Sequence, residues 1–255
     1  MVKLIDLSVP LSPDVKEPLP PSIVYHSHEE GAEQGASLLG IEKEAFRHGK
    51  AWATETVTAN THAGTHIDAP WHYGEQSEGK PARTIDVMPL EWFYADAVLF
   101  DFSQHPPGYE ISSDDLKEQL ADMNYSLKPY DIVLVRSDAD KKIYDESYAF
   151  LHAGVSAEAT HWLLDQGIKV VGTDGWGWDI PLTVQAKQHQ ANPEKGVMWD
   201  AHYVGIEKEY CQIEKLANLD QIPVRHGFKV SCFPVNIEKA SGAWARPVAY
   251  IEESM

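Results

Sequence analysis

Residues 61–72 read Thr-His-Ala-Gly-Thr-His-Ile-Asp-Ala-Pro-Trp-His, and this stretch is the most informative part of the chain for both fold and chemistry. His62, His66, Asp68 and His72 follow the spacing His-x3-His-x-Asp-x3-His. Imidazole nitrogen and carboxylate oxygen are the ligands that a divalent catalytic metal takes in a site with an open position. A lone histidine is usually a hydrogen-bonded loop residue, but this clustering favours a metal centre.

The local chain path also follows from this stretch. Gly64 and Pro70 argue against one continuous helix and favour a tight loop that leads off a strand. His72 comes after the proline, on a chain that the proline re-aims. It is a candidate metal ligand and equally a candidate proton shuttle, because neutral imidazole near physiological pH can take up and return a proton.

The composition of the chain narrows the class of protein and its expected partners. The chain has 255 residues, 43% of them hydrophobic and 24% charged, which is typical of a globular protein. The net charge of −18 predicts repulsion from nucleic acid and from anionic membranes, so neither is an expected partner. No uncharged apolar run approaches the ~18–20 residues that a membrane helix needs. Cys211 and Cys232 form no CxxC pair, which argues against a thiolate zinc site and favours a reducing cytoplasm.

Sequence patterns predict an α/β (mixed α+β) fold that is richer in strands than in helices. Segments with buried or alternating apolar positions predict strands at 4–9, 54–59, 95–102, 131–136, 169–173, 228–235 and 245–251. Serine caps and acidic first turns predict helices at 113–123 and 156–166. The proline-rich stretch 17–21 predicts an extended surface loop. No linker-like shift in composition occurs, so residues 1–255 are expected to form one domain.

The histidine stretch resembles the HxGTHxDxPxH signature of the cyclase-like metal-dependent hydrolase family, whose branches include bacterial kynurenine formamidases and isatin hydrolases. Weaker similarities follow in the family's order, at residues 4–8 (LIDLS), 131–136 (DIVLVR), 171–174 (VGTD), 214–219 (EKLANL) and 246–249 (RPVA). The resemblance implies a swivelling β/β/α domain that forms a homo-oligomer, a dimer or a tetramer.

The resemblance also implies roles for individual residues. His62, His66 and Asp68 match the primary metal ligands, and His72 matches the general acid/base. In the formamidase branch a later histidine and a glutamate twelve residues further on complete a two-metal site, and His202 and Glu214 have this spacing. The isatin hydrolase branch holds one metal. The expected cofactor is therefore Zn²⁺ or Mn²⁺, with one or two ions per chain.

Residues around the motif are candidates for substrate binding. Trp176 and Trp178 offer flat apolar walls for a small planar or aromatic substrate, although tryptophan in a core or an interface is equally expected. Trp71, inside the motif, is the aromatic residue expected to lie nearest the metal and to contact the substrate. Arg246 is a candidate partner for a substrate carboxylate, with a solvated or ion-paired role as the alternative. Asp174 is expected either to orient a ligand histidine or to cap a turn.

The expected function is hydrolysis of a carboxamide, formamide or cyclic amide C–N bond by metal-bound hydroxide, with His72 as the general acid/base, in the manner of an arylformamidase. The insertion at residues 181–198 departs from the compact formamidases and weakens the transfer of their substrate. One alternative is an isatin-hydrolase-like enzyme or a lactone or ester hydrolase with the same metal site. Another is a metal- or ligand-binding protein without turnover, which requires His72 to be a ligand.

Overall fold

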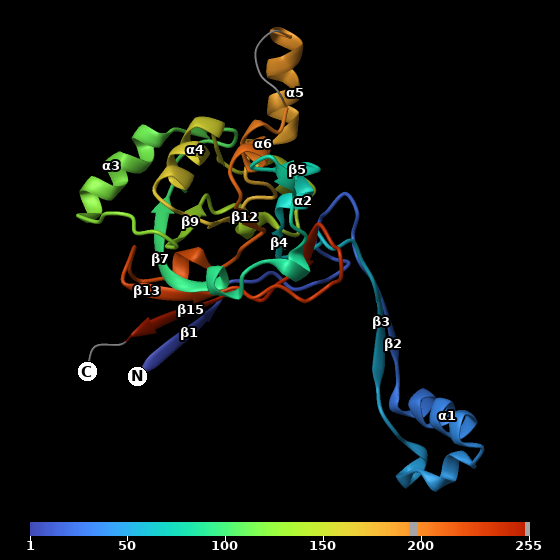
Figure 1. The fold of residues 1–255 in the computed structure, drawn as a ribbon. Coiled ribbons are helices and arrows are strands. Elements are labelled where there is room, and N and C mark those ends of the chain that lie inside the picture. Colours follow the sequence, from blue (N-terminus) through green and yellow to red (C-terminus); the bar gives the residue numbers. More distant parts are fainter. Residues whose placement is uncertain (194–197, 253–255) are drawn as a thin grey trace.

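The computed structural model describes residues 1–193 and 198–252, and a nine-stranded mixed sheet forms its body (Figure 1). The strand order is β1-β15-β13-β7-β9-β11-β12-β4-β14. Four neighbouring strands are parallel, namely β7 (Tyr94–Asp101), β9 (Ile132–Arg136), β11 (Val170–Thr173) and β12 (Cys211–Glu214). Antiparallel strands extend both edges, namely β13 (Phe228–Ser231), β15 (Val248–Glu252) and β1 (Val2–Asp6) beside β7, and β4 (His66–Asp68) and β14 (Gly242–Trp244) beside β12.

The central strands are buried on both faces, which explains their nearly continuous apolar sequences. In β7, Ala97 and Leu99 face one hydrophobic core, whereas Val98 and Phe100 face the other. Residues of β9 alternate in the same way between the two cores. This alternation follows from the two-residue period of a strand.

Six α-helices lie within the described residues: α1 (His28–Leu39), α2 (Pro70–Tyr73), α3 (Ser113–Met123), α4 (Ala157–Asp165), α5 (Leu182–Ala191) and α6 (Asp200–Glu207). Helices α3 and α4 pack together over the core that contains Val98. Their N-caps are Ser112 and Ser156, whose side chains accept backbone N–H bonds. Two short pairs complete the body, β5 (Gln76–Ser77) with β6 (Lys80–Pro81) and β8 (Glu110–Ile111) with β10 (Gly154–Val155).

An arm at residues 22–58 leaves this body. It consists of the antiparallel hairpin β2 (Ser22–His26) and β3 (Thr54–Thr58), with α1 at its far end (Figure 1). Nearly all residues of the two strands are exposed. A small cluster of Phe46 and Trp52 packs against Gly31 and Gly35 of α1, where a larger side chain would collide.

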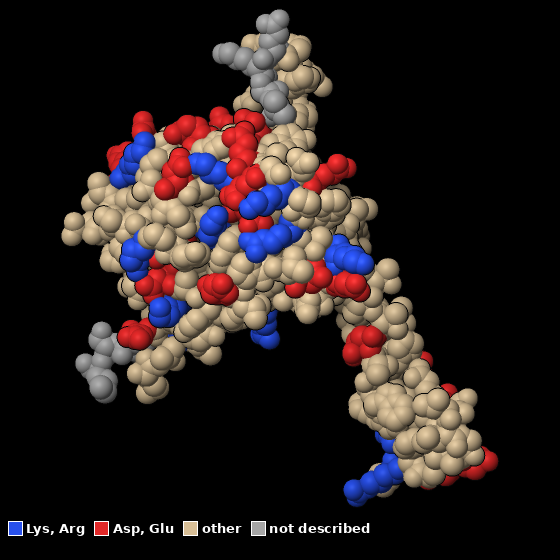
Figure 2. Space-filling model, viewed as in Figure 1, with Lys and Arg blue, Asp and Glu red and all other residues tan. Residues whose placement is uncertain are grey.

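The mixed α/β, strand-rich fold class predicted from the sequence is confirmed. The predicted strand at 54–59 exists, but it belongs to the arm and not to the body. Helix α5 occupies much of the predicted insertion 181–198, whose residues 194–197 lie outside the described residues. None of the described helices combines the length and the apolar character that a membrane span requires. On the face in Figure 2, basic side chains are interspersed with acidic ones.

Candidate metal centre

Strand β4 presents two candidate ligands on one face of the sheet. His66 and Asp68 are two residues apart and point the same way, whereas Ile67 between them enters the hydrophobic core. Glu214 at the end of β12 pairs in register with His66. His66 Nε2 lies 3.1 Å from Asp68 Oδ1 and 3.6 Å from Glu214 Oε2. The three side chains are buried together.

His62 reaches this cluster from the loop before β4. Its Nδ1 lies 2.7 Å from Asp68 Oδ1, and its Nε2 lies 2.9 Å from Ser241 Oγ. Gly242 leaves the room that the ring needs, because a Cβ there would stand 2.7 Å from His62 Cε1. Gly64 adopts φ 61°, a left-handed conformation that glycine accepts without strain.

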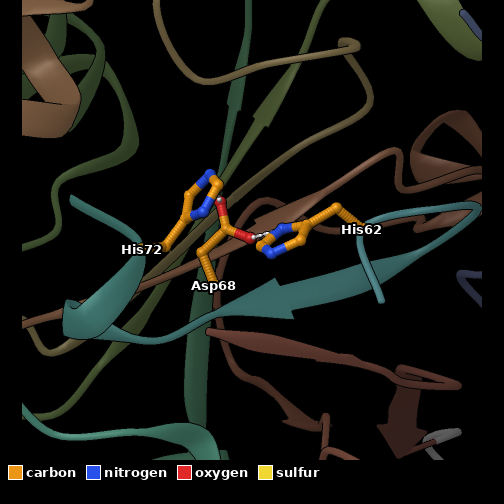
Figure 3. Close-up of side chains that lie close together, drawn as sticks. All are labelled: His62, Asp68 and His72. Carbon is orange, nitrogen blue, oxygen red and sulfur yellow. Dashed lines mark hydrogen bonds and ion pairs between the residues drawn. The ribbon is translucent and has the colours of Figure 1, made fainter. Parts of the chain in front are cut away.

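The short helix α2 carries His72 to the other side of the Asp68 carboxylate, with Pro70 at its first turn (Figure 3). His72 Nε2 lies 3.9 Å from Asp68 Oδ2. The His72 and His62 rings stack with centroids 4.1 Å apart. The Asp68 carboxylate therefore faces two imidazoles from opposite ends of the motif, with Oδ1 toward His62 and Oδ2 toward His72.

Helix α6 supplies His202, and Asp179 orients it. The Asp179 carboxylate accepts hydrogen bonds from His202 Nδ1 and from the backbone N–H of Ala201 and His202 at the start of α6. His202 Nε2 then faces the carboxylates, 3.3 Å from Glu214 Oε1 and 3.9 Å from Asp68 Oδ2. A carboxylate behind a histidine in this way fixes its tautomer and its orientation toward a metal.

Two atoms in this cluster test whether the residues fit a metal. His66 Nε2 and Asp68 Oδ2 are buried and have no hydrogen-bond partner among the described residues. His66 Nδ1 donates to the Gly64 carbonyl at 2.9 Å, so its Nε2 offers a lone pair to the cluster. Unpaired buried polar atoms are costly, and a cation between the imidazoles and carboxylates would satisfy both of them. The donor set fits a divalent metal.

The charge state of the carboxylates is consistent with this fit. Burial raises the pKa of Asp68, but the nearby imidazoles of His72 and His66 outweigh burial and hold it well below its usual value. Burial and the charge of Asp68 raise the pKa of Glu214, and the contacts with His202 reverse this effect and lower it. Both groups are thus ionised, as metal ligands must be.

The pKa values of His72 and His202, two histidines next to these carboxylates, are shifted in opposite directions. Burial lowers the pKa of His72, despite the charge of Asp68. Burial also disfavours charged His202, but Asp179 and Glu214 overcome it and raise the pKa of His202 to about 10. His72 is therefore suited to act as a neutral base, whereas His202 must release a proton to bind a metal.

A cavity of about 250 Å³ opens onto the cluster. His62, His72, His202 and Glu214 line one part of it. The other wall residues come from the loop before β10 (His152), the segment after β11 (Trp176, Gly177, Asp179 and Ile180), α5 (Leu182 and Gln185), the residue before α6 (Trp199) and the residue after β12 (Lys215). The Trp199 indole stacks on the His202 ring with centroids 4.3 Å apart.

The predictions for the three tryptophans have different outcomes. Trp176 lines the cavity, as the sequence suggested. Trp178 is fully buried in the core, and its Nε1–H donates to Thr160 Oγ1 at 2.9 Å, so its predicted substrate contact is wrong. Trp71 is 43% exposed and is not among the cavity residues, because α2 turns His72 inward and Trp71 outward. A substrate contact of Trp71 within this chain is therefore not supported.

Arg246 and Asp174 also differ from the functional expectation. Arg246 is exposed and pairs with Asp6 at 2.7 Å, beside a different hollow, so it takes the ion-paired alternative. The Asp174 carboxylate accepts from the backbone N–H groups of Ser137 and Asp138 and from the Ser137 hydroxyl. It caps the turn after β9 and orients no ligand histidine.

Sequence reasoning missed Asp179, Trp199 and His152. Asp179 lies 23 positions from His202, and nothing in the sequence indicates that these two residues meet. His152 reaches the cavity from a loop, with Nε2 donating to the Asp179 carbonyl at 3.0 Å. Its ring packs against Gly175, where a Cβ would collide with it.

Fold and site together define a mixed α/β protein with a buried histidine–carboxylate centre that is suited to a divalent metal. Residues 5–180 match the family described as "Cyclase: Putative cyclase", and the chain belongs to this family.

Individual relatives agree with this assignment. The chain is 27% identical over 220 residues to an isatin hydrolase from Roseibium aggregatum, covering 81% of this chain and 78% of that protein. It is 27% identical over 192 residues to a kynurenine formamidase from Erythrobacter litoralis, covering 75% and 74%. The structure of an isatin hydrolase bound to the product analogue thioisatinate has the same fold, with a TM-score of 0.76 and 22% identity over 99% of this chain and 93% of that one.

Proposed function

We propose that this protein is a metal-dependent hydrolase that cleaves the C–N bond of a small aromatic carboxamide, formamide or cyclic amide. The observation that carries the proposal is the convergence of His66 Nε2 and Asp68 Oδ2, buried and unpaired, on Glu214 and His202. The relatives named isatin hydrolase and kynurenine formamidase support the reaction class.

His62, His66, Asp68, His202 and Glu214 are the residues that would hold the metal. Zn²⁺ or Mn²⁺ suits nitrogen and oxygen ligands. Asp68 and Glu214 each have a second oxygen that faces a different histidine, so the cluster has donors for one or two ions. When bound, a divalent cation supplies Lewis acidity, which makes water nucleophilic near neutral pH and polarises a carbonyl.

His72 is the proposed general acid/base. Its ring lines the cavity, and its Nε2 lies 3.9 Å from Asp68 Oδ2, too far for a hydrogen bond. Its lowered pKa keeps the ring neutral, so it can take a proton as water attacks and return it to the leaving nitrogen. Trp176 and Trp199 provide apolar walls for a planar substrate.

The test is the variant His72→Ala, measured for both metal content and turnover of an aryl formamide, a cyclic amide and a matched lactone. We expect the metal to be retained and kcat to fall roughly 100- to 10,000-fold, the usual value of general acid–base catalysis. Near-normal kcat contradicts the role of His72. Loss of metal makes His72 a ligand and favours the binding protein without turnover. Preference for the lactone favours the ester-hydrolase alternative.

We also propose that the protein forms a homo-oligomer and that the arm contacts a second copy. Leu38, Leu39 and Tyr25 of the arm are exposed, with Leu38 80% accessible. A two-stranded ribbon with both faces in water is marginally stable by itself. A second chain that covers the exposed apolar side chains of the arm would stabilise it. The cytoplasmic location expected from the two cysteines stays a prediction.

A further inference from the structure

A buried ion pair lies directly behind the metal-binding loop. Glu17 comes from the segment between β1 and the arm, and Lys215 follows Glu214 at the end of β12. Lys215 Nζ lies 2.8 Å from Glu17 Oε2, and the two side chains are only 3% and 4% exposed. Burying two charges carries a large desolvation cost, so general stabilisation is a poor explanation for this pair.

Both charged groups bind the backbone of the loop that carries His62. Lys215 Nζ donates to the His62 carbonyl at 2.8 Å. Glu17 Oε1 accepts from the Gly64 N–H at 2.7 Å. The Gly64 carbonyl in turn accepts from His66 Nδ1. The ion pair thus holds the loop at two points, one at the His62 carbonyl and one at the N–H of Gly64, the residue whose carbonyl sets the His66 tautomer.

Other hydrogen bonds hold the two ends of this loop, because the Ala63 N–H donates to the Asn60 carbonyl at 3.0 Å and the Ala245 N–H donates to the Thr65 carbonyl at 3.1 Å, whereas Glu17 and Lys215 bind its middle. Gly64 lies in the left-handed region, and residues 59–65 belong to no helix or strand. Backbone groups of a buried loop need partners, and here two charged side chains supply them. Charge-assisted hydrogen bonds are stronger and more directional than neutral ones.

We propose that Glu17 and Lys215 are positioning residues for the metal centre, which hold His62 and His66 in ligand geometry through the backbone of residues 62–64. This inference rests on the proposed metal-dependent function. Groups that orient metal ligands typically change metal affinity about 10- to 100-fold when they are removed. We therefore expect loss of the pair to weaken metal binding by this factor.

The backbone around Lys215 has anchors that do not depend on its side chain. Its N–H donates to the Gly175 carbonyl at 3.0 Å, and its carbonyl accepts from Thr65 Oγ1 at 2.5 Å. Replacing the side chain therefore leaves the end of β12 in place. The single variant Lys215→Met does strand the buried Glu17 charge, whereas the double variant Glu17→Gln/Lys215→Met removes both charges at nearly constant volume.

The experiment measures the Zn²⁺ dissociation constant of the full-length protein by competition with a chromophoric chelator, together with denaturant unfolding of the metal-free protein. It compares wild type, Lys215→Met, the double variant and the control Lys229→Met, whose ammonium pairs with Asp96 on the surface. We expect Zn²⁺ affinity to fall about 10- to 100-fold in both pair variants and to stay unchanged in the control.

Each other outcome overturns a defined claim. Unchanged Zn²⁺ affinity in the folded double variant contradicts the positioning role, even if metal-free stability changes. Loss of cooperative unfolding in both pair variants also contradicts it, because the pair would then be a general folding requirement. A wild-type protein that binds no Zn²⁺ contradicts the proposed function itself.

Discussion

At the residue scale, the meeting of the motif side chains could be predicted from the sequence, whereas the contacts that support them could not. His62, His66, Asp68 and His72 meet as their spacing suggested, because alternation along β4 and the turn at Pro70 are local properties. Asp179 and the Glu17–Lys215 pair depend on long-range contacts that leave no local pattern. Trp176 and Trp178 looked alike in the sequence, and only the packing separates a cavity wall from a core residue.

The contact between Asp179 and His202 gives a first prediction. Asp179→Asn keeps the size of the side chain but removes the charge that orients His202. We expect metal affinity to fall about 10- to 100-fold, as for other groups behind a ligand histidine. Titration of the folded variant with Zn²⁺ measures this affinity. The control is Asp200→Asn, which removes a carboxylate from α6, the helix that carries His202. Wild-type affinity in Asp179→Asn would exclude the orienting role.

His152 gives a second prediction, on the pH dependence of stability. Burial lowers the pKa of His152 to about 4, although the hydrogen bond to Asp179 opposes this shift. The unfolded chain, with an ordinary pKa of about 6.5, takes up a proton first as the pH falls. The stability contribution of neutral His152 is therefore complete above pH ~6.5 and is lost as the pH falls to ~4.

The stability that His152 contributes, and that is lost between pH ~6.5 and pH ~4, amounts to about 3 kcal/mol, because each unit of difference in pKa corresponds to about 1.4 kcal/mol. The measurement is urea unfolding of metal-free wild type and His152→Gln between pH 7 and pH 4. We expect the free energy of unfolding of the variant to fall less, by about this amount. Parallel curves for the two proteins would show that His152 does not titrate as its burial requires.

At the element scale, the central strands and helices α3 and α4 were predicted, whereas α1 and the three-residue strands were not. Helices α3 and α4 begin at serine caps and occur where predicted. Helix α1 was missed because Gly31 and Gly35 are poor helix formers, which its contacts with Trp52 and Phe46 explain. Strands β4 and β14 have three residues each, too few for a periodic signal.

The arm gives a prediction at this scale. Leu38→Glu places a charge on the exposed apolar end of α1, and we expect it to weaken the association of chains without unfolding them, because a charge is costly in an apolar interface. Sedimentation velocity of the full-length protein measures the mass. The matched control is Ser37→Glu, which adds the same charge at the neighbouring exposed position. A wild-type protein that is already monomeric, or an unchanged mass in Leu38→Glu, would contradict the contact.

At the scale of the whole molecule, the sheet order is what assembles the centre. Strand β4 follows the arm early in the chain yet lies between β12 and β14, which come from its last third. This insertion brings His66 and Asp68 beside Glu214. The family resemblance anticipated the meeting of His202 and Glu214 with the motif, whereas local patterns alone gave no topology.

The central claim is that this assembled cluster binds a divalent metal, and counting metal directly tests it. Purified wild-type protein and Asp68→Ala are incubated with Zn²⁺ or Mn²⁺, dialysed, and measured by elemental analysis per chain. We predict one or two ions in the wild type and a large loss in Asp68→Ala, because Asp68 contacts every histidine of the cluster. A wild-type protein without bound metal, or an Asp68→Ala variant with full occupancy, would contradict the account.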